Sequence, residues 1–159
     1  MAVDEAQLTN DLDGLARAYA RLSRDVGGRI DFACDSGSDD ALKVAEQEKY
    51  HLDQAFFVLS FAALEKQLTL LASANSTSDD GRALMRKAKF EQRLQSAIKV
   101  VRDKMGVEPA WSESRSDIQS WYGVRNDIAH GNSPAALFDI PPIIDLARKV
   151  EETLGQVGA

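Results

Sequence analysis

The chain has 159 residues, 44% of them hydrophobic and 28% charged, and its formal net charge at pH 7 is -6. This size and apolar content predict a single domain, residues 1–159, with its own core. The acidic N-terminus does not resemble a signal peptide and no apolar run approaches a membrane span, so we expect a cytoplasmic protein without a membrane partner. Since the chain has 1 cysteine and 2 histidines, an internal disulfide and a cysteine-based zinc site are excluded, and we expect no metal and no cofactor.

The N-terminal segment predicts a helix over residues 4–26. Its apolar residues are spaced alternately four and three apart, as in a heptad seam: Leu8, Leu12, Leu15, Tyr19, Leu22 and Val26. Such a seam either packs within the monomer or joins two protomers. Gly27 and Gly28 are expected to end the helix, and residues 31–40 to form a flexible polar connection that carries Cys34 as a free thiol.

A second long helix is predicted over residues 40–74. Its middle, residues 55–64, is apolar on nearly every side, which favours a buried central helix. Glu65 directly follows this run, and its carboxylate either pairs with an arginine elsewhere in the fold or lies exposed beside Lys66. His51, on the same helix, is interpreted as an ordinary surface or boundary histidine.

Positive charge is concentrated in residues 82–104, which carry 8 basic and 2 acidic side chains, whereas the segments on either side are acidic. This region predicts one helix over residues 79–105, ended by Gly106. On a regular helix, several basic side chains then fall within an arc of about 60° beside an apolar face. We predict that four of them bind RNA phosphates: Arg82, Arg86, Lys89 and Arg93. A solvated charged face is the alternative.

A further helix is predicted from a serine cap at Ser112 or Ser114 to about His130, with Gly131 as its left-handed stop. It carries the sequence R-N-x-x-x-H at Arg125, Asn126 and His130. Asn126 and His130 fall within about 40° of each other on the helix surface. Arg125 points into an apolar arc, so its guanidinium needs a partner. Glu65 and Asp127 are candidate supporting carboxylates, and a second chain is another possibility.

The last helix is predicted to start at Pro141-Pro142, because proline suits the first turn of a helix. No strand alternation and no internal repeat is present. The sequence therefore predicts an all-α fold, an up-and-down bundle of about five helices. Residues 1–38 supply the N-terminal helix and its connection, and residues 39–155 the core.

The motif residues suit phosphate chemistry. The guanidinium of Arg125 matches two phosphate oxygens, His130 can transfer a proton near neutral pH, and Asn126 can position the substrate or His130. Each residue also has a purely structural interpretation when it is taken alone. Arg125 could form a structural ion pair, and His130 could simply end the helix. The motif has a single histidine per chain, whereas cleavage needs both a general base and a general acid, which favours two motifs facing each other in a homodimer.

The segment V-R-N-D-I-A-H-G, with Arg125, Asn126 and His130, resembles the motif of the HEPN domains (higher eukaryotes and prokaryotes nucleotide-binding). The apolar run at residues 56–65 resembles the central helix of that family, and the element order is similar over about residues 45–155. The resemblance implies a metal-independent endoribonuclease that acts as a homodimer, a toxin or antiviral defence effector with an antitoxin or nucleotidyltransferase partner. Some members have no nuclease activity, so it also allows a non-catalytic module that binds a nucleotide or a partner protein.

Overall fold

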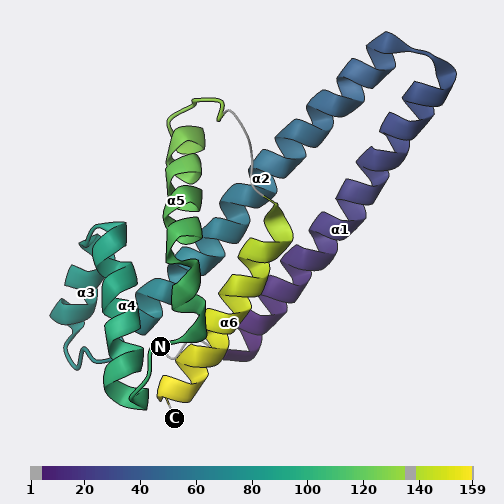
Figure 1. The fold of residues 1–159 in the computed structure, drawn as a ribbon. Helices are drawn as coiled ribbons and strands as arrows, with labels where there is room; N and C mark the ends of the chain where they lie inside the picture. The colour runs from purple at the N-terminus through teal and green to yellow at the C-terminus, as the bar shows by residue number, and fades with distance from the viewer. Residues whose placement is uncertain (1–4, 135–138, 159) are drawn as a thin grey trace.

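The computed structural model describes residues 5–134 and 139–158, which form six α-helices and one short 3-10 helix and contain no strand (Figure 1). The elements are α1 (Glu5–Ser36), α2 (Asp39–Ala72), α3 (Asp79–Lys87), α4 (Phe90–Met105), η1 (Ala110–Ser114), α5 (Arg115–Ala129) and α6 (Ile140–Gly158). The predicted all-α bundle is confirmed. The sixth helix arises because the predicted third helix is in fact two.

Helix α2 is the central element, and it contacts α1, α4, α5 and α6. Five of its apolar side chains have no exposed surface and are spaced four and three apart: Phe57, Phe61, Leu64, Leu68 and Leu71. Burial of each contributes about 1.5–3 kcal/mol. By length and composition α2 is also apolar enough to cross a membrane, which the sequence interpretation had missed. Half of its most apolar window is buried inside the bundle, as in a core helix.

Helix α1 is longer than predicted, because it continues through Gly27 and Gly28 as far as Ser36 and turns only at Gly37, where φ is +66°. The predicted flexible connection is therefore wrong. The apolar seam explains the difference: Ala33 lies one heptad beyond Val26, and both are buried, so packing against α2 outweighs the helix cost of two glycines, about 1 kcal/mol each. The seam packs within the monomer, and the side chain of Leu8 lies outside the described residues.

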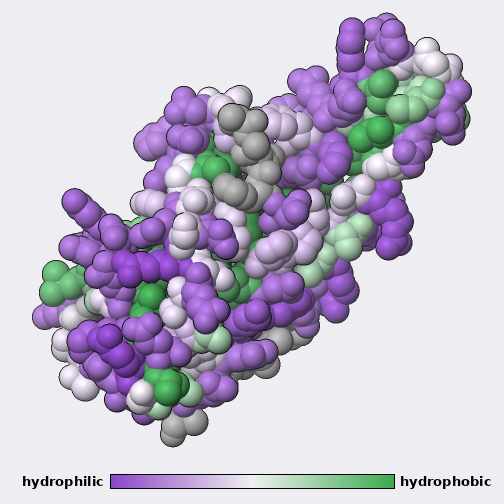
Figure 2. All heavy atoms as spheres, viewed as in Figure 1, coloured by the Kyte–Doolittle hydropathy of each residue, from purple (hydrophilic) through white to green (hydrophobic). Residues whose placement is uncertain are grey.

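The distal parts of α1 and α2, residues 27–48, form an arm that projects beyond the other helices (Figure 1). Cys34 lies exposed on it as a free thiol. Figure 2 shows apolar side chains gathered toward the end of this arm, where Phe32 and Val44 are exposed. The arm is thus held by the pairing of two helices, whereas the rest of the protein has a shared core.

The predicted helix over residues 79–105 is interrupted at Ala88 and Lys89, whose backbone is extended (ψ of 153° and 148°). The Gln92 side chain accepts a hydrogen bond from the Lys89 backbone N–H and so caps the start of α4. The break lets Phe90 enter the core at 3% exposure, whereas α3 has no buried residue. A single continuous helix here is therefore a wrong prediction.

Helix α5 follows η1, whose Trp111 is buried and donates a hydrogen bond from Nε1 to Thr153 Oγ1 of α6 at 3.0 Å. The C-cap of α5 is His130, and Gly131 has the predicted positive φ of 76°. Helix α6 begins at Ile140, with Pro141 and Pro142 in its first turn as predicted.

Candidate active site

The R-N-x-x-x-H motif lies at the C-terminal end of α5, away from the α4 end of the bundle (Figure 1). Arg125 and Asn126 are partly buried, and His130 is exposed. The backbone N–H of His130 donates to the Asn126 carbonyl at 3.0 Å, which closes the last helical turn. The backbone of His130 is thereby held at the helix end, and its exposed side chain is accessible to a ligand.

Arg125 has the partner that its position requires. Its Nη2 lies 3.8 Å from Glu65 Oε2 of α2, and its Nη1 donates to Asn126 Oδ1 at 3.1 Å. Of the two alternatives left open for Glu65, the structure shows the ion pair with Arg125 and not an exposed position beside Lys66. Asp127, the other candidate, is exposed and forms no ion pair in the part of the chain that the structure describes. The side chain of Arg125 is still 34% exposed, so part of the guanidinium faces solvent.

Glu65 is shared between two arginines. Its Oε1 lies 2.6 Å from Arg93 Nη2, and Arg93 Nη1 also donates to Thr69 Oγ1 at 3.0 Å. The Arg93 and Glu65 side chains are only 14% and 17% exposed. Two guanidiniums on one carboxylate leave a net positive charge beside the motif, which favours a bound anion.

Aromatic packing fixes α5 against α4 next to this cluster. The rings of Phe90 and Tyr122 stack with centroids 4.3 Å apart and an interplanar angle of 12°. Phe61 of α2 contacts both rings, and Arg93 lies over the Phe90 ring at 5.7 Å. Because Tyr122 lies about one turn before Asn126 on α5, this stack positions the motif relative to α2 and α4.

The four residues predicted to bind RNA do not form one stripe, because the helix that was to align them is broken. Arg82 donates to the Ser76 carbonyl and pairs with Asp79, whose pKa is lowered by the hydrogen bond and charge of Arg82. Arg93 is committed to Glu65. The side chains of Arg86 and Lys89 are exposed and form no ion pair within 4 Å among the described residues, although the charge of Arg86 also lowers the pKa of Asp79. Their role in RNA binding stays a prediction.

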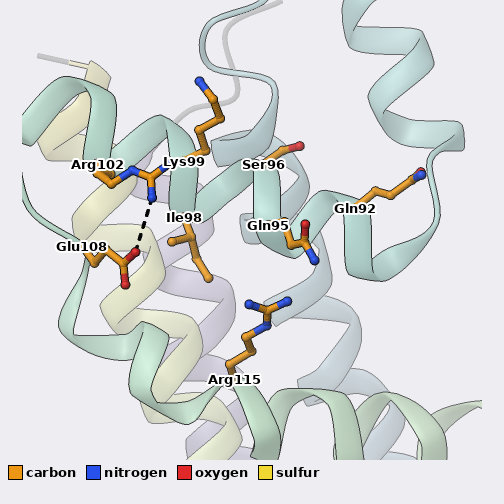
Figure 3. Close-up of a pocket in the computed structure, with 8 residues that line it drawn as sticks. All are labelled: Gln92, Gln95, Ser96, Ile98, Lys99, Arg102, Glu108 and Arg115. Atoms are coloured by element: carbon orange, nitrogen blue, oxygen red, sulfur yellow. Dashed lines mark ion pairs between the residues drawn. The ribbon is translucent and has the colours of Figure 1, made fainter.

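A basic groove that the sequence interpretation missed lies between α4 and the start of α5, with a volume of about 470 Å³. Its lining includes three basic residues: Lys99, Arg102 and Arg115. Figure 3 shows the Arg115 guanidinium and the Gln95 side chain pointing toward each other beside Ile98, while Lys99 extends away from them. The excess of basic residues in this segment could have indicated the groove, but its location follows only from the true helix boundaries.

The cations of this groove are loosely paired. Arg102 Nη1 lies 3.6 Å from Glu108 Oε1, and Arg115 Nη2 lies 3.7 Å from Glu91 Oε1. Both distances exceed that of a direct hydrogen bond. Lys99 is the exception, since its Nζ donates to Asp103 Oδ2 at 2.5 Å. The two guanidiniums therefore keep donors that a ligand can use.

The apolar face of the motif helix is covered within its own chain. Trp121, on the apolar face of the motif helix, is 7% exposed within its own chain, and Ile128 packs against the same core. With Arg125 paired to Glu65, this face is satisfied without a second chain. The apolar face therefore gives no separate reason for a second chain, and the homodimer stays a prediction.

Within the described residues, no three or more His, Cys, Asp and Glu side chains form a cluster suited to a metal ion. His51 is exposed and contacts the ring of Tyr50, as expected for a surface histidine. No family model, curated protein or solved structure matches the chain.

Proposed function

We propose that the chain is an endoribonuclease of the HEPN type, which acts in the cytoplasm as a homodimer and serves as a toxin or defence effector. The observation that carries the proposal is the C-terminal part of α5, which holds a partly exposed guanidinium at Arg125, paired with Glu65, and an exposed histidine at His130. These are the two groups that phosphodiester cleavage needs: a fixed positive charge for the phosphate and a group that moves a proton.

In the proposed reaction the 2'-hydroxyl of the substrate attacks the adjacent phosphorus. A bond forms between O2' and phosphorus, the bond from phosphorus to O5' breaks, and the RNA is left with a 2',3'-cyclic phosphate. Arg125 stabilises the charge that develops on the phosphoryl oxygens. His130 accepts the proton of the 2'-hydroxyl, and the leaving O5' takes a proton from His130 of the partner subunit. Asn126 holds the Arg125 guanidinium through Oδ1.

The dimer is proposed for this chemical reason, because one histidine cannot accept one proton and donate another in the same step. Light scattering at micromolar concentration should give twice the monomer mass of 17.4 kDa. A stable monomer that still cleaves RNA would remove the two-fold site from the proposal.

The proposed site is tested by substituting Arg125 and the attacking hydroxyl. Arg125→Ala should lower the rate by about 10² or more, and Arg125→Lys should not restore it, since lysine has no bidentate fork. Wild-type protein should leave 2'-O-methyl RNA intact and produce 2',3'-cyclic phosphate ends on ordinary RNA. Because Arg125 also pairs with Glu65, each variant is compared with wild type by thermal unfolding. Wild-type rates in the Arg125 variants would refute the assignment.

The second candidate is a non-catalytic module that binds a nucleotide or a partner protein, such as an antitoxin or a nucleotidyltransferase. The observation in its favour is that Arg125 already donates a hydrogen bond to Asn126 and lies in an ion pair with Glu65 at 3.8 Å, which suits a static binding surface. It predicts that purified protein cleaves no RNA and that Arg125→Ala weakens binding without any change in RNA products.

A further inference from the structure

The groove between α4 and α5 has the charge and the free donors expected of a phosphate site. Arg102 and Arg115 face it from two different helices, and their side chains are 52% and 42% exposed. Neither forms a hydrogen bond at normal distance to the described residues, because their carboxylates lie at 3.6 and 3.7 Å. A phosphate can therefore replace Glu91 and Glu108 at little cost, since exposed ion pairs contribute about 0–1 kcal/mol.

The groove also has groups that suit the rest of a nucleotide. The Gln95 side chain faces Arg115 beside the apolar side chain of Ile98 (Figure 3). A carboxamide both donates and accepts hydrogen bonds, as base edges do, and Ile98 offers an apolar surface. Glu108 opposes an anion here and must turn away from the groove when a phosphate binds.

Helix α5 connects this groove to the motif. Arg115 is its first residue and His130 its C-cap, so they are about 22 Å apart along the axis and within about 60° of each other around it. Between them on this face lie Gln119, which is exposed, and Asn126 and Tyr122, which are partly buried, with the Tyr122 ring stacked on Phe90. One face of α5 thus runs from the basic groove to the candidate active site.

We infer that the groove formed by Arg102, Arg115 and Gln95 binds the backbone phosphates of a single-stranded RNA that lies along α5, with its cleaved linkage at the motif. This inference rests on the proposed function, because it takes the scissile phosphate to lie at Arg125 and His130. At about 3.4 Å per stacked nucleotide, the separation corresponds to about six nucleotides. A probe of three nucleotides is too short to use the groove and the motif together.

The experiment measures binding alone, with a fluorescent 2'-O-methyl RNA of twelve nucleotides that has no 2'-hydroxyl to attack. The variant Arg102→Gln/Arg115→Gln should raise Kd by on the order of tenfold at 0.1 M salt and lower the slope of log K against log salt by about 1.4, since each phosphate contact on a single strand contributes about 0.7. The matched control, Arg21→Gln/Arg24→Gln on the exposed surface of α1, removes the same charge and should change Kd little.

Two further measurements sharpen the result. Arg86→Gln/Lys89→Gln measures what the rest of the basic segment contributes to binding of the same strand, and its loss of affinity should be smaller than that of the groove variant. For a three-nucleotide probe, the groove variant should bind to the motif as wild type does. Any of three results would overturn the inference. The groove variant and the control could have equal Kd and salt slope, or the groove variant could lose as much affinity for the short probe as for the long one. Wild-type protein could also fail to bind the long probe.

This outcome is separable from that of the proposed function. If the groove variant binds the long probe as the control does, cleavage at the motif can still occur, and it is measured with ordinary RNA. Conversely, a protein that binds the long probe through the groove but cuts no RNA would refute the proposed nuclease and retain the phosphate site.

Discussion

Two arginine–carboxylate pairs, one near the motif and one in the groove, differ in distance and burial. Glu65 and Arg93 meet at 2.6 Å with less than a fifth of each side chain exposed, whereas Arg102 and Glu108 lie 3.6 Å apart with more than half of each exposed. A buried pair leaves an uncompensated charge when one partner is removed, while an exposed pair is screened by water. The first pair therefore fixes the fold around the motif, and the second leaves a cation available to a ligand.

Removing the shared carboxylate should have the largest effect on stability. Glu65→Gln leaves Arg93 and Arg125 without their anion, and we expect the free energy of unfolding to fall by about 3 kcal/mol. Urea denaturation measures it, with Glu108→Gln as the matched control, for which the change should stay below about 1 kcal/mol. Equal losses in the two variants would contradict the contrast between the sites.

The hydrogen bond between Tyr19 and Asp53 is partly buried, so it lies between the buried pair of Glu65 and Arg93 and the exposed pair of Arg102 and Glu108. The Tyr19 hydroxyl donates to Asp53 Oδ1 at 3.0 Å, and burial, followed by the charge and hydrogen bond of Asp53, raises the pKa of Tyr19 from 10.0 to about 12. The folded protein thus keeps a proton between pH 10 and 12 that the unfolded chain releases, so stability falls as pH rises through this window.

Tyr19→Phe removes that linkage. At neutral pH it should cost about 1 kcal/mol for the lost hydrogen bond. Between pH 8 and pH 11, wild type should lose more stability than the variant does. Parallel pH profiles in urea denaturation would show that the Tyr19 hydroxyl is not held as described.

The smallest effect is expected for Arg115 and Glu91, the exposed pair of the groove. A double-mutant cycle with Arg115→Gln and Glu91→Gln should give a coupling energy below about 0.5 kcal/mol, and 0.5 M salt should abolish it. A coupling above 2 kcal/mol would mean that Arg115 is held by Glu91 and is not free to bind phosphate.

The sequence predicted the ends of some helices better than those of others. The bounds of α2 and α5 and the start of α6 were predicted within a few residues. Gly131 marks the end of α5 and the two prolines the start of α6, whereas Ser114 accepts no capping hydrogen bond at the start of α5. The continuation of α1 past Gly27 and Gly28 was not predicted, because it depends on packing against α2. The break at Lys89 was also missed, since it is stabilised by the burial of Phe90 against Tyr122.

In the candidate site, too, features that depend on one helix were predicted, whereas most contacts between helices were not. The requirement that Arg125 have a partner was evident from its place in an apolar arc, and Glu65 was a correct candidate. The second arginine on Glu65 was not foreseen, because a continuous helix over residues 79–105 placed Arg93 on a basic stripe. The groove of Arg102 and Arg115 joins two helices, so no spacing within either one indicates it.

Cleavage of a fluorescent RNA in the presence of EDTA, by His130→Ala and by His51→Ala, tests the central claim most directly. The two variants lose the same side chain from exposed positions, so neither should unfold the protein. The account predicts that wild type and His51→Ala cut the RNA at equal rates, while His130→Ala is slower by about 10² or more, the usual contribution of a positioned proton-transfer group. Equal cleavage by the two variants, or none by wild type, would contradict it.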